Sequence, residues 1–346
     1  VTLISRDDGA FYSKPNLSNA LAANRTAAEL VGASAEKMAA DLGATVLTHT
    51  EIEAIDTATR RLRYSGGGIE YARLVLALGA DTLAHGLGGA VLTVNDLADY
   101  ARFRAAIEDK VRVAVLGGGL IGCEFANDLV QAGYAVEVVH AGAWPLDRLL
   151  PAEAGRRLSD ALARLGVQWH FGRRAKALLR AGAGYALVLD DGGRIETDVV
   201  LSAIGLKPRI ALAKAAGIAT GHGITVDRRL QTSAPGIYAV GDCAEVDGVN
   251  LPFVQPLMAQ ARALAATLAG EIAEVNYPPM PVLVKTPAHP VVALPPAPGS
   301  EGRWRIESGT GGVCALYVDA ADRVQGFALT GSETARRASL VQSMTA

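Results

Sequence analysis

Residues 111–140, "VRVAVLGGGLIGCEFANDLVQAGYAVEVVH", constrain the fold of this chain more than any other stretch. An apolar strand runs into a glycine-rich turn, a helix follows, and a second apolar strand ends the stretch. In Gly117-x-Gly119-x-x-Gly122, the first glycine allows the tight turn and the second lets the backbone approach a pyrophosphate. The third lets helix and strand pack closely, and the helix N-terminus favours phosphate charge. The stretch predicts a dinucleotide-binding unit; a glycine turn that binds nothing is the alternative.

The residue that ends the second strand bears on which dinucleotide binds. NAD-binding units usually carry an acid there for the ribose 2′-hydroxyl, but here the position is His140. Glu137 lies within the strand, where its side chain need not reach the ribose, and the nearest cation that follows is Arg148. The motif leaves NAD or NADP open, and the lack of a cation pair for a 2′-phosphate favours NAD.

Composition narrows the range of partners. Length (346 residues) allows two or three domains, and a chain that is half hydrophobic with 38 glycines suits an α/β fold. Lys plus Arg (33) nearly balances Asp plus Glu (35), which predicts neither nucleic-acid binding nor attraction to an anionic membrane. No apolar run is long enough to span a membrane and no signal peptide is visible, so we expect a cytoplasmic protein. Three scattered cysteines (Cys123, Cys243 and Cys314) offer neither a CxxxxC pair nor a metal spacing, and we expect no metal.

Outside residues 111–140, the pattern predicts further elements at regular places. A buried strand is expected at 1–5 and a turn into a helix at 12–22. Residues 44–80 predict a strand, a hairpin and a buried strand ending at Gly79, a layout that recurs weakly at 161–209. The remaining expectations are a helix at 95–110, a strand at the Gly-Asp of 230–246, a helix within 250–270, and a strand-rich segment after the Pro-rich 277–281.

Gly241-Asp242 ends a predicted buried strand and could aim one carboxylate at a ribityl hydroxyl of a flavin. A turn-forming Asp is the alternative. The helix that follows begins near Gln255 to Leu257, and its dipole could stabilise negative charge on a flavin's pyrimidine edge.

Six stretches carry a resemblance to a known family: "YSKPNLS", "LIGCEFANDL", "GLKPR", "IYAVGDCAEVDG", "PLMAQARALAATLAG" and "MPVLVKTPA". The chain resembles the FAD-dependent pyridine nucleotide-disulfide reductase superfamily and, within it, the bacterial rubredoxin reductases. The resemblance implies an α/β fold with two Rossmann-like, three-layer ββα dinucleotide-binding domains, the NAD domain inserted in the FAD domain, plus a small C-terminal α+β domain. It assigns FAD binding to residues 1–95 and 210–276, NAD binding to 96–209, and an interface domain to 277–346. A first glycine fingerprint is expected before Val1.

The resemblance also implies an activity. Hydride passes from NADH to FAD, and single electrons then reduce rubredoxin, a small acidic iron protein, in an electron-transport chain such as one that serves an alkane hydroxylase. The absence of CxxxxC fits an external carrier, and no side chain is expected to act as acid or base. A reductase of ferredoxin or another iron–sulfur carrier, an NADH oxidase of the same fold, and a nucleotide-binding redox sensor remain alternatives. A monomer is favoured.

Site residues follow from the same resemblance. Those expected near FAD are Asp7 (with Asp8 as alternate), Lys14, Pro15, Ile52, Gly79, Glu124, Asp242, Val254 and Lys285. Those expected near NAD are Gly117, Gly119, Gly122, Glu124, His140 and Gly205. Related ferredoxin reductases have a Lys where this chain has Asn19, so Lys14 or Lys285 must supply the cation beside Glu124. Plain alternatives are turn formation for the acids, core packing for Ile52 and solvation for the lysines. Rubredoxin steering is assigned to Lys14, Lys285, Arg303 and Arg305.

Overall fold

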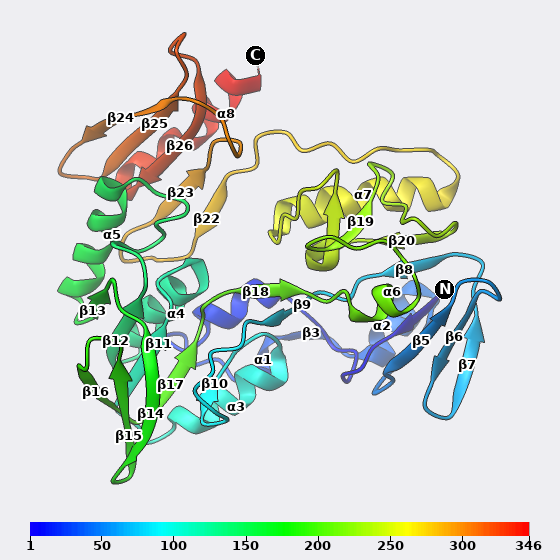
Figure 1. The fold of residues 1–346 in the computed structure, drawn as a ribbon, viewed down its shortest axis with the longest axis horizontal. Coiled ribbons are helices and arrows are strands. Elements are labelled where there is room, and N and C mark those ends of the chain that lie inside the picture. The colour runs from blue at the N-terminus through cyan, green and yellow to red at the C-terminus, as the bar shows by residue number, and fades with distance from the viewer. Residues whose placement is uncertain (346) are drawn as a thin grey trace. The chain divides into compact units, whose positions relative to one another are not determined.

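The computed structural model describes residues 1–345, which divide into two compact units. Unit 1 comprises Val1–Tyr12, Val31–Asp81 and Leu206–Met280, and unit 2 comprises Ser13–Leu30, Thr82–Gly205 and the described residues from Pro281 onward. The sequence assignment differs in grouping residues 13–30 with FAD binding and in separating 277–346. Figure 1 shows the elements of both units.

A five-stranded parallel sheet is the centre of unit 2, in the order β10-β17-β11-β12-β13. Its strands are β10 (Val91–Leu92), β17 (Val199–Ser202), β11 (Arg112–Leu116), β12 (Ala135–His140) and β13 (Gln168–Phe171). The quoted stretch forms β11, α4 (Leu120–Gln131) and β12, as predicted. The helix predicted at 95–110 is α3 (Leu97–Ile107), which begins where the Asp96 carboxylate accepts from the Asp99 amide.

Alternate residues of these strands face two different layers. Leu116 and Val139 pack on one face against Leu187 and Ile195 of an antiparallel sheet. That sheet is β14 (Ala175–Ala181), β15 (Gly184–Leu189) and β16 (Arg194–Thr197). Helix α4 contacts β11 and β12 of the parallel sheet. Phe125 of α4 meets Phe103 of α3 edge to face, with 5.8 Å between the ring centroids. The three-layer ββα arrangement predicted for an NAD domain is therefore present.

The strand-rich C-terminal segment forms a second five-stranded sheet of unit 2, antiparallel, in the order β22-β23-β26-β25-β24. Its elements are β22 (Val282–Val284), β23 (Val291–Leu294), β24 (Arg303–Ser308), β25 (Val313–Val318), β26 (Val324–Thr330), η3 (Gly331–Arg336) and α8 (Arg337–Thr345). Leu316 and Phe327 pack with Leu340 of α8. Helix α5 (Ala152–Arg164) contacts β25 and β26, and its Arg157 donates to the Gly309 carbonyl at 3.0 Å. Unit 2 also contains η1 (Lys14–Asn19) and α1 (Ala27–Leu30).

Unit 1 is built of short paired strands around one core. β1 (Thr2–Ile4) pairs with β4 (Thr45–Leu47), β8 (Leu74–Leu76) with β20 (Ile237–Ala239), and β19 (Ile224–Val226) with β21 (Ala244–Val246), all parallel. The other elements are β2 (Phe11–Tyr12), β3 (Val31–Ala33), α2 (Ala35–Leu42), β5 (Ile52–Asp56), β6 (Arg61–Tyr64), β7 (Gly67–Glu70), β9 (Ala80–Thr82), β18 (Leu206–Pro208), α6 (Ala211–Ala215), η2 (Gly241–Cys243) and α7 (Val254–Ala269). Leu62 of the β5–β7 sheet, Leu76 of β8 and Leu264 of α7 share this core.

Three expectations need correction. The strand at 1–5 exists but is not buried, because β1 pairs on one edge only and Leu3 is 43% exposed. In place of a helix over the predicted 12–22 the structure has a six-residue 3₁₀ helix, η1, with Pro15 in its first turn. The strand before Gly79 is only partly buried, since Val75 is exposed. Among residues 1–345, no helix is long and apolar enough to cross a membrane.

Candidate functional site

The glycine turn between β11 and α4 has the packing that the motif requires. Gly117 has φ +101°, and a Cβ there would lie 2.5 Å from the Ala203 carbonyl oxygen. A Cβ on Gly122 would lie 1.8 Å from the Gly117 carbonyl oxygen. A Cβ on Gly119 would meet nothing within 4 Å, and no side chain caps the N-terminus of α4 that begins there. Gly119 thus keeps the helix N-terminus open, which suits a pyrophosphate.

His140 ends β12 and binds the glycine turn rather than pointing away from it. Its Nδ1 accepts a hydrogen bond from the Gly118 amide at 3.0 Å. Glu137 points elsewhere in the described structure, because its carboxylate lies 2.8 Å from Nε2 of His170 on β13. Gly205 follows β17 with φ +128° in unit 2, and its carbonyl accepts from the Leu83 amide at 3.0 Å.

A buried ionic cluster is centred on Glu124, the fifth residue of α4. The Glu124 side chain is 1% exposed, and its Oε2 lies 2.9 Å from Nζ of Lys285. Ser18 of η1 donates to the same oxygen at 2.5 Å, and the Lys285 amide donates to Oε1 at 2.9 Å. The Lys285 ammonium also donates to the Pro15 carbonyl. Of the two lysines expected beside Glu124, Lys285 makes the pair, while Lys14 forms the first residue of η1.

Two further side chains of α4 extend this cluster along the helix. Asp128 accepts from the amides of Leu21 at 2.8 Å and Ala22 at 3.1 Å, and Asn127 accepts from the Ala288 amide at 3.2 Å. Burial raises the pKa of the Asp128 carboxyl, and the two backbone hydrogen bonds oppose that rise. The polar face of α4 therefore anchors both η1 with its following turn and the loop that leads out of β22.

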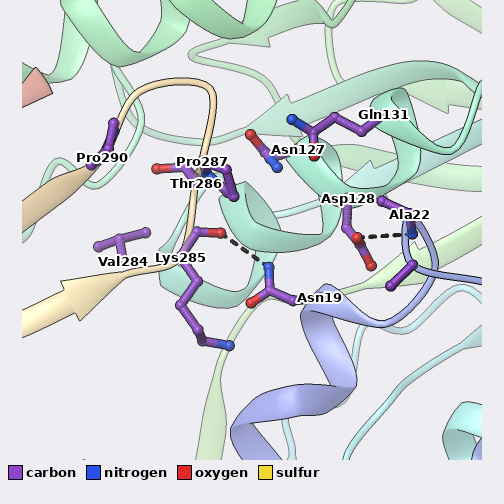
Figure 2. A pocket seen from close by; sticks show the side chains of 11 residues that line it. Asn19, Ala22, Asn127, Asp128, Gln131, Val284, Lys285, Thr286, Pro287 and Pro290 are labelled. Atoms are coloured by element: carbon purple, nitrogen blue, oxygen red, sulfur yellow. Dashed lines mark hydrogen bonds between the residues drawn. The ribbon is translucent and has the colours of Figure 1, made fainter. Parts of the chain in front are cut away.

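Helix α4, the end of η1 with its following turn, and the loop after β22 line an open groove of about 420 Å³ in unit 2 (Figure 2). Figure 2 shows Asn127, Asp128 and Gln131 of α4 on one side and the 284–290 loop on the other, with Asn19 between them. Asn19 donates from Nδ2 to the Lys285 carbonyl at 3.2 Å, while its buried Oδ1 has no hydrogen-bond partner among the described residues.

The Gly-Asp turn of unit 1 is held by residues that the sequence did not single out. Gln260 of α7 accepts from the Gly241 amide at 2.6 Å and donates to the Tyr277 hydroxyl at 2.8 Å. Asn250 donates to the Asp242 carbonyl at 2.9 Å. Gly241 has φ +76°, which favours glycine. Within the described chain the Asp242 carboxylate makes no hydrogen bond or ion pair, so it is available to a ligand hydroxyl.

The remaining unit 1 candidates come from several separate places in the chain. Val254 is the first residue of α7 and is 52% exposed, and no side chain caps that helix. Gly79 has φ +69° and its carbonyl accepts from the Arg209 amide at 3.0 Å. Ile52 packs against the unit 1 core. Asp7 accepts from the Gly9 amide at 2.9 Å, and Asp8 accepts from the Ala10 amide at 3.0 Å. Both acids thus form turns, which leaves their ribose role a prediction.

The cysteines are packing residues in this structure. All three are free and buried. Burial raises the pKa of the Cys123 and Cys243 thiols, which makes them poor nucleophiles. In the part of the chain that the structure describes, no three His, Cys, Asp or Glu side chains gather in a group that could hold a metal ion.

Sequence reasoning missed Ser18, Asp128, Asn250 and Gln260. "YSKPNLS" and "CEFANDL" both carried the family resemblance, but nothing in one sequence says that Ser18 meets Glu124 or that Asp128 meets Leu21. A polar residue on the apolar face of a helix, as at Asp128 and Gln260, is the signal that could have found two of them.

Comparison with known proteins identifies the class. Residues 1–266 match the family described as pyridine nucleotide-disulphide oxidoreductase, so the chain belongs to that family. Residues 274–344 match the rubredoxin binding C-terminal domain. The family resemblance stated from the sequence is thereby confirmed.

Particular relatives narrow the comparison. The chain is 48% identical to the rubredoxin-NAD(+) reductase of Alcanivorax borkumensis, over 100% of this chain and 92% of that protein. It is 41% identical to the enzyme of the same name from Acinetobacter baylyi, over 97% of this chain and 89% of that protein. The solved structure of a ferredoxin reductase from Rhodopseudomonas palustris aligns with a TM-score of 0.87 at 27% identity, over 95% of this chain and 84% of that one. The predicted α/β fold class is confirmed.

Proposed function

We propose that the protein is an NADH-dependent flavoprotein reductase, an oxidoreductase that binds FAD and NAD(H) and passes electrons to rubredoxin. One observation carries the carrier assignment. The segment matched by the rubredoxin binding domain supplies Lys285, and Lys285 pairs with Glu124 of α4, the helix that follows the dinucleotide fingerprint. The two rubredoxin-NAD(+) reductases described above support the same conclusion.

The residues present fit both cofactors. For FAD, Asp242 offers an uncommitted carboxylate, and the uncapped N-terminus of α7 offers backbone N–H groups to an anionic edge. For NAD(H), the open N-terminus of α4 at Gly119 offers the same to a pyrophosphate. We assign to FAD the set Asp7, Asp8, Lys14, Pro15, Ile52, Gly79, Glu124, Asp242, Val254 and Lys285, and to NAD(H) the set Gly117, Gly119, Gly122, Glu124, His140 and Gly205.

The bound flavin would supply the chemistry, taking a hydride from NADH and giving two single electrons to two ferric rubredoxins. The chain's own side chains bind the cofactors and hold the binding segments in place. Asp242 accepts from ligand hydroxyls, and Gln260 and Asn250 hold its turn in place. Glu124 has both oxygens engaged and acts as a positioning residue that holds Lys285 and η1. No residue acts as an acid or base in this scheme.

We further propose that residues 1–95 and 210–276 form the FAD domain, 96–209 the NAD domain and 277–346 the interface domain. The separate core of the C-terminal sheet supports the last of these. We also propose a monomeric, cytoplasmic protein, with neither nucleic acid nor membrane as a partner. The near balance of Lys plus Arg (33) with Asp plus Glu (35) supports the absence of nucleic-acid and membrane partners.

Stopped-flow spectroscopy tests the proposal. Protein reconstituted with FAD should lose its flavin absorbance on anaerobic mixing with NADH and regain it on mixing with oxidised rubredoxin. Flavin that NADH does not bleach would favour a redox sensor. Equal rates with rubredoxin and ferredoxin would leave a flavin reductase but remove the named carrier.

A further inference from the structure

The loop after β12 folds back onto the glycine turn. The Leu146 amide donates to the Gly118 carbonyl at 2.8 Å, and the Leu146 side chain is buried. Leu146 has φ +58°, a conformation that is uncommon for a branched side chain and costs free energy. Since Gly118 also donates to His140, both backbone groups of Gly118 are engaged by this loop and by the end of β12. The loop is therefore held on the dinucleotide fingerprint.

The folded-back loop after β12 brings Asp147 beside His140. Because Nδ1 of His140 accepts from Gly118, the ring proton belongs on Nε2. That nitrogen is buried without a hydrogen-bond partner in the described chain, and Oδ1 of Asp147 lies 3.5 Å from it. Gly142 makes room, because a Cβ there would lie 2.0 Å from Oδ2 of Asp147 and 2.7 Å from Nε2 of His140. An N–H donor and a carboxylate thus lie together where an NAD-binding unit ordinarily has its acid.

Other charges near this place are already engaged or lie at the surface. Glu137 is paired with His170, which removes the strand acid as an acceptor. Arg173, whose amide donates to the His140 carbonyl, has its guanidinium 2.5 Å from the Asp191 carboxylate. Arg148 is exposed and forms no ion pair within residues 1–345. The Asp147 side chain is 33% exposed, so a ligand can reach it.

We infer that Asp147 is the specificity-determining residue that selects a free ribose 2′-hydroxyl over a 2′-phosphate, an inference that rests on the proposed NAD(H) site. A ribose 2′-hydroxyl can donate its proton to the exposed carboxylate of Asp147, while the buried Nε2–H of His140, 3.5 Å from Oδ1, faces that carboxylate from the protein side. A 2′-phosphate at neutral pH only accepts, and its negative charge is repelled by Asp147. The acid missing from the strand end is thus replaced by an acid from the following loop.

Titration calorimetry of the full chain with ADP-ribose and with 2′-phospho-ADP-ribose tests this. The wild type should bind ADP-ribose more tightly. Asp147→Asn should raise the ratio of 2′-phospho-ADP-ribose affinity to ADP-ribose affinity by about tenfold, because one negative charge is removed beside the phosphate. Asp147→Glu keeps the charge and should keep the wild-type preference. The control is Asp160→Asn, an exposed change on α5 that should leave both affinities unchanged.

The outcomes separate the two hypotheses. If the wild type binds neither ligand, the proposed NAD(H) site fails. If it binds ADP-ribose and Asp147→Asn leaves the affinity ratio within about twofold, the inference about Asp147 is wrong while the site stands. A wild type that prefers the 2′-phosphate would also overturn the inference and would point to Arg148. The stopped-flow preference for NADH over NADPH should shift in parallel with the calorimetric ratio.

Discussion

Replacing Lys285 by Met should destabilise unit 2 through the carboxylate that it leaves behind. Met has a similar length but no charge, so the ion pair is lost while most of the side-chain volume is kept. Glu124 would then keep its hydrogen bonds from Ser18 and from the backbone at position 285, but would lose its cation in a buried place.

The magnitude follows from the geometry. At 2.9 Å and an effective dielectric constant near ~20, the attraction is on the order of 5 kcal/mol before desolvation is subtracted. The Lys285 side chain is 35% exposed, so water screens the pair, and two hydrogen bonds to the carboxylate remain. We therefore expect a net coupling of about 1–3 kcal/mol.

A double-mutant cycle measures this coupling directly. Urea unfolding of the wild type, Lys285→Met, Glu124→Gln and the double variant gives the coupling as the departure from additivity. Hydrogen exchange should also quicken in peptides that contain the amides of Lys285 and Ala288, since both donate to α4 side chains. Lys176→Met is the control, because Lys176 is exposed on β14, and it should change stability by less than about 0.5 kcal/mol.

Two results would refute the reasoning. A coupling below about 0.5 kcal/mol would mean that the pair contributes no more than an exposed salt bridge. Unchanged exchange at residues 285–288 would mean that the loop is held by other contacts, and the cluster would lose its role as an anchor.

The other predictions concern the flavin, acid stability and the carrier. Asp242→Ala should weaken FAD binding by about 1–3 kcal/mol, because ligand hydroxyls lose a charged acceptor; an unchanged flavin dissociation constant would limit Asp242 to a turn role. The hydrogen bond from Arg112 lowers the pKa of Asp198 to about 2. A lowered carboxyl pKa contributes stability that is full above the unfolded value near ~4 and is lost as pH falls through the folded value. Since Arg112 is 43% exposed, Asp198→Asn should cost about 1–2 kcal/mol at neutral pH, and urea unfolding should show that cost shrinking between pH ~4 and ~2; a cost independent of pH would contradict the ion-pair explanation. Finally, rubredoxin reduction should slow as salt rises while NADH-to-flavin reduction barely changes, because exposed cations such as Arg305 steer an acidic carrier; parallel salt dependence in stopped flow would argue against steering.

The sequence predicted what depends on neighbours in the chain. The glycine spacing of residues 117–122 imposes a tight turn and an open helix N-terminus through local sterics, and both are present. The nearly continuous apolar runs predicted β11 and β12, because a strand buried on both faces needs apolar side chains throughout. The burial of the strand at 1–5 was overestimated, because an apolar run does not reveal how many edges of the strand are paired.

Only the tertiary structure decided which polar groups meet. Glu124 and Lys285 lie 161 residues apart, and their pairing depends on how the loop after β22 reaches α4. The sequence limited the cation beside Glu124 to Lys14 or Lys285 but could not choose between them. Likewise, His140 was recognised as a histidine in an acid's place, yet its hydrogen bond to Gly118 and its neighbour Asp147 depend on a loop that folds back through a left-handed Leu146. Local sterics and hydrophobic periodicity act between residues close in sequence, whereas the desolvation that forces buried charges to find partners acts only after distant segments have packed together.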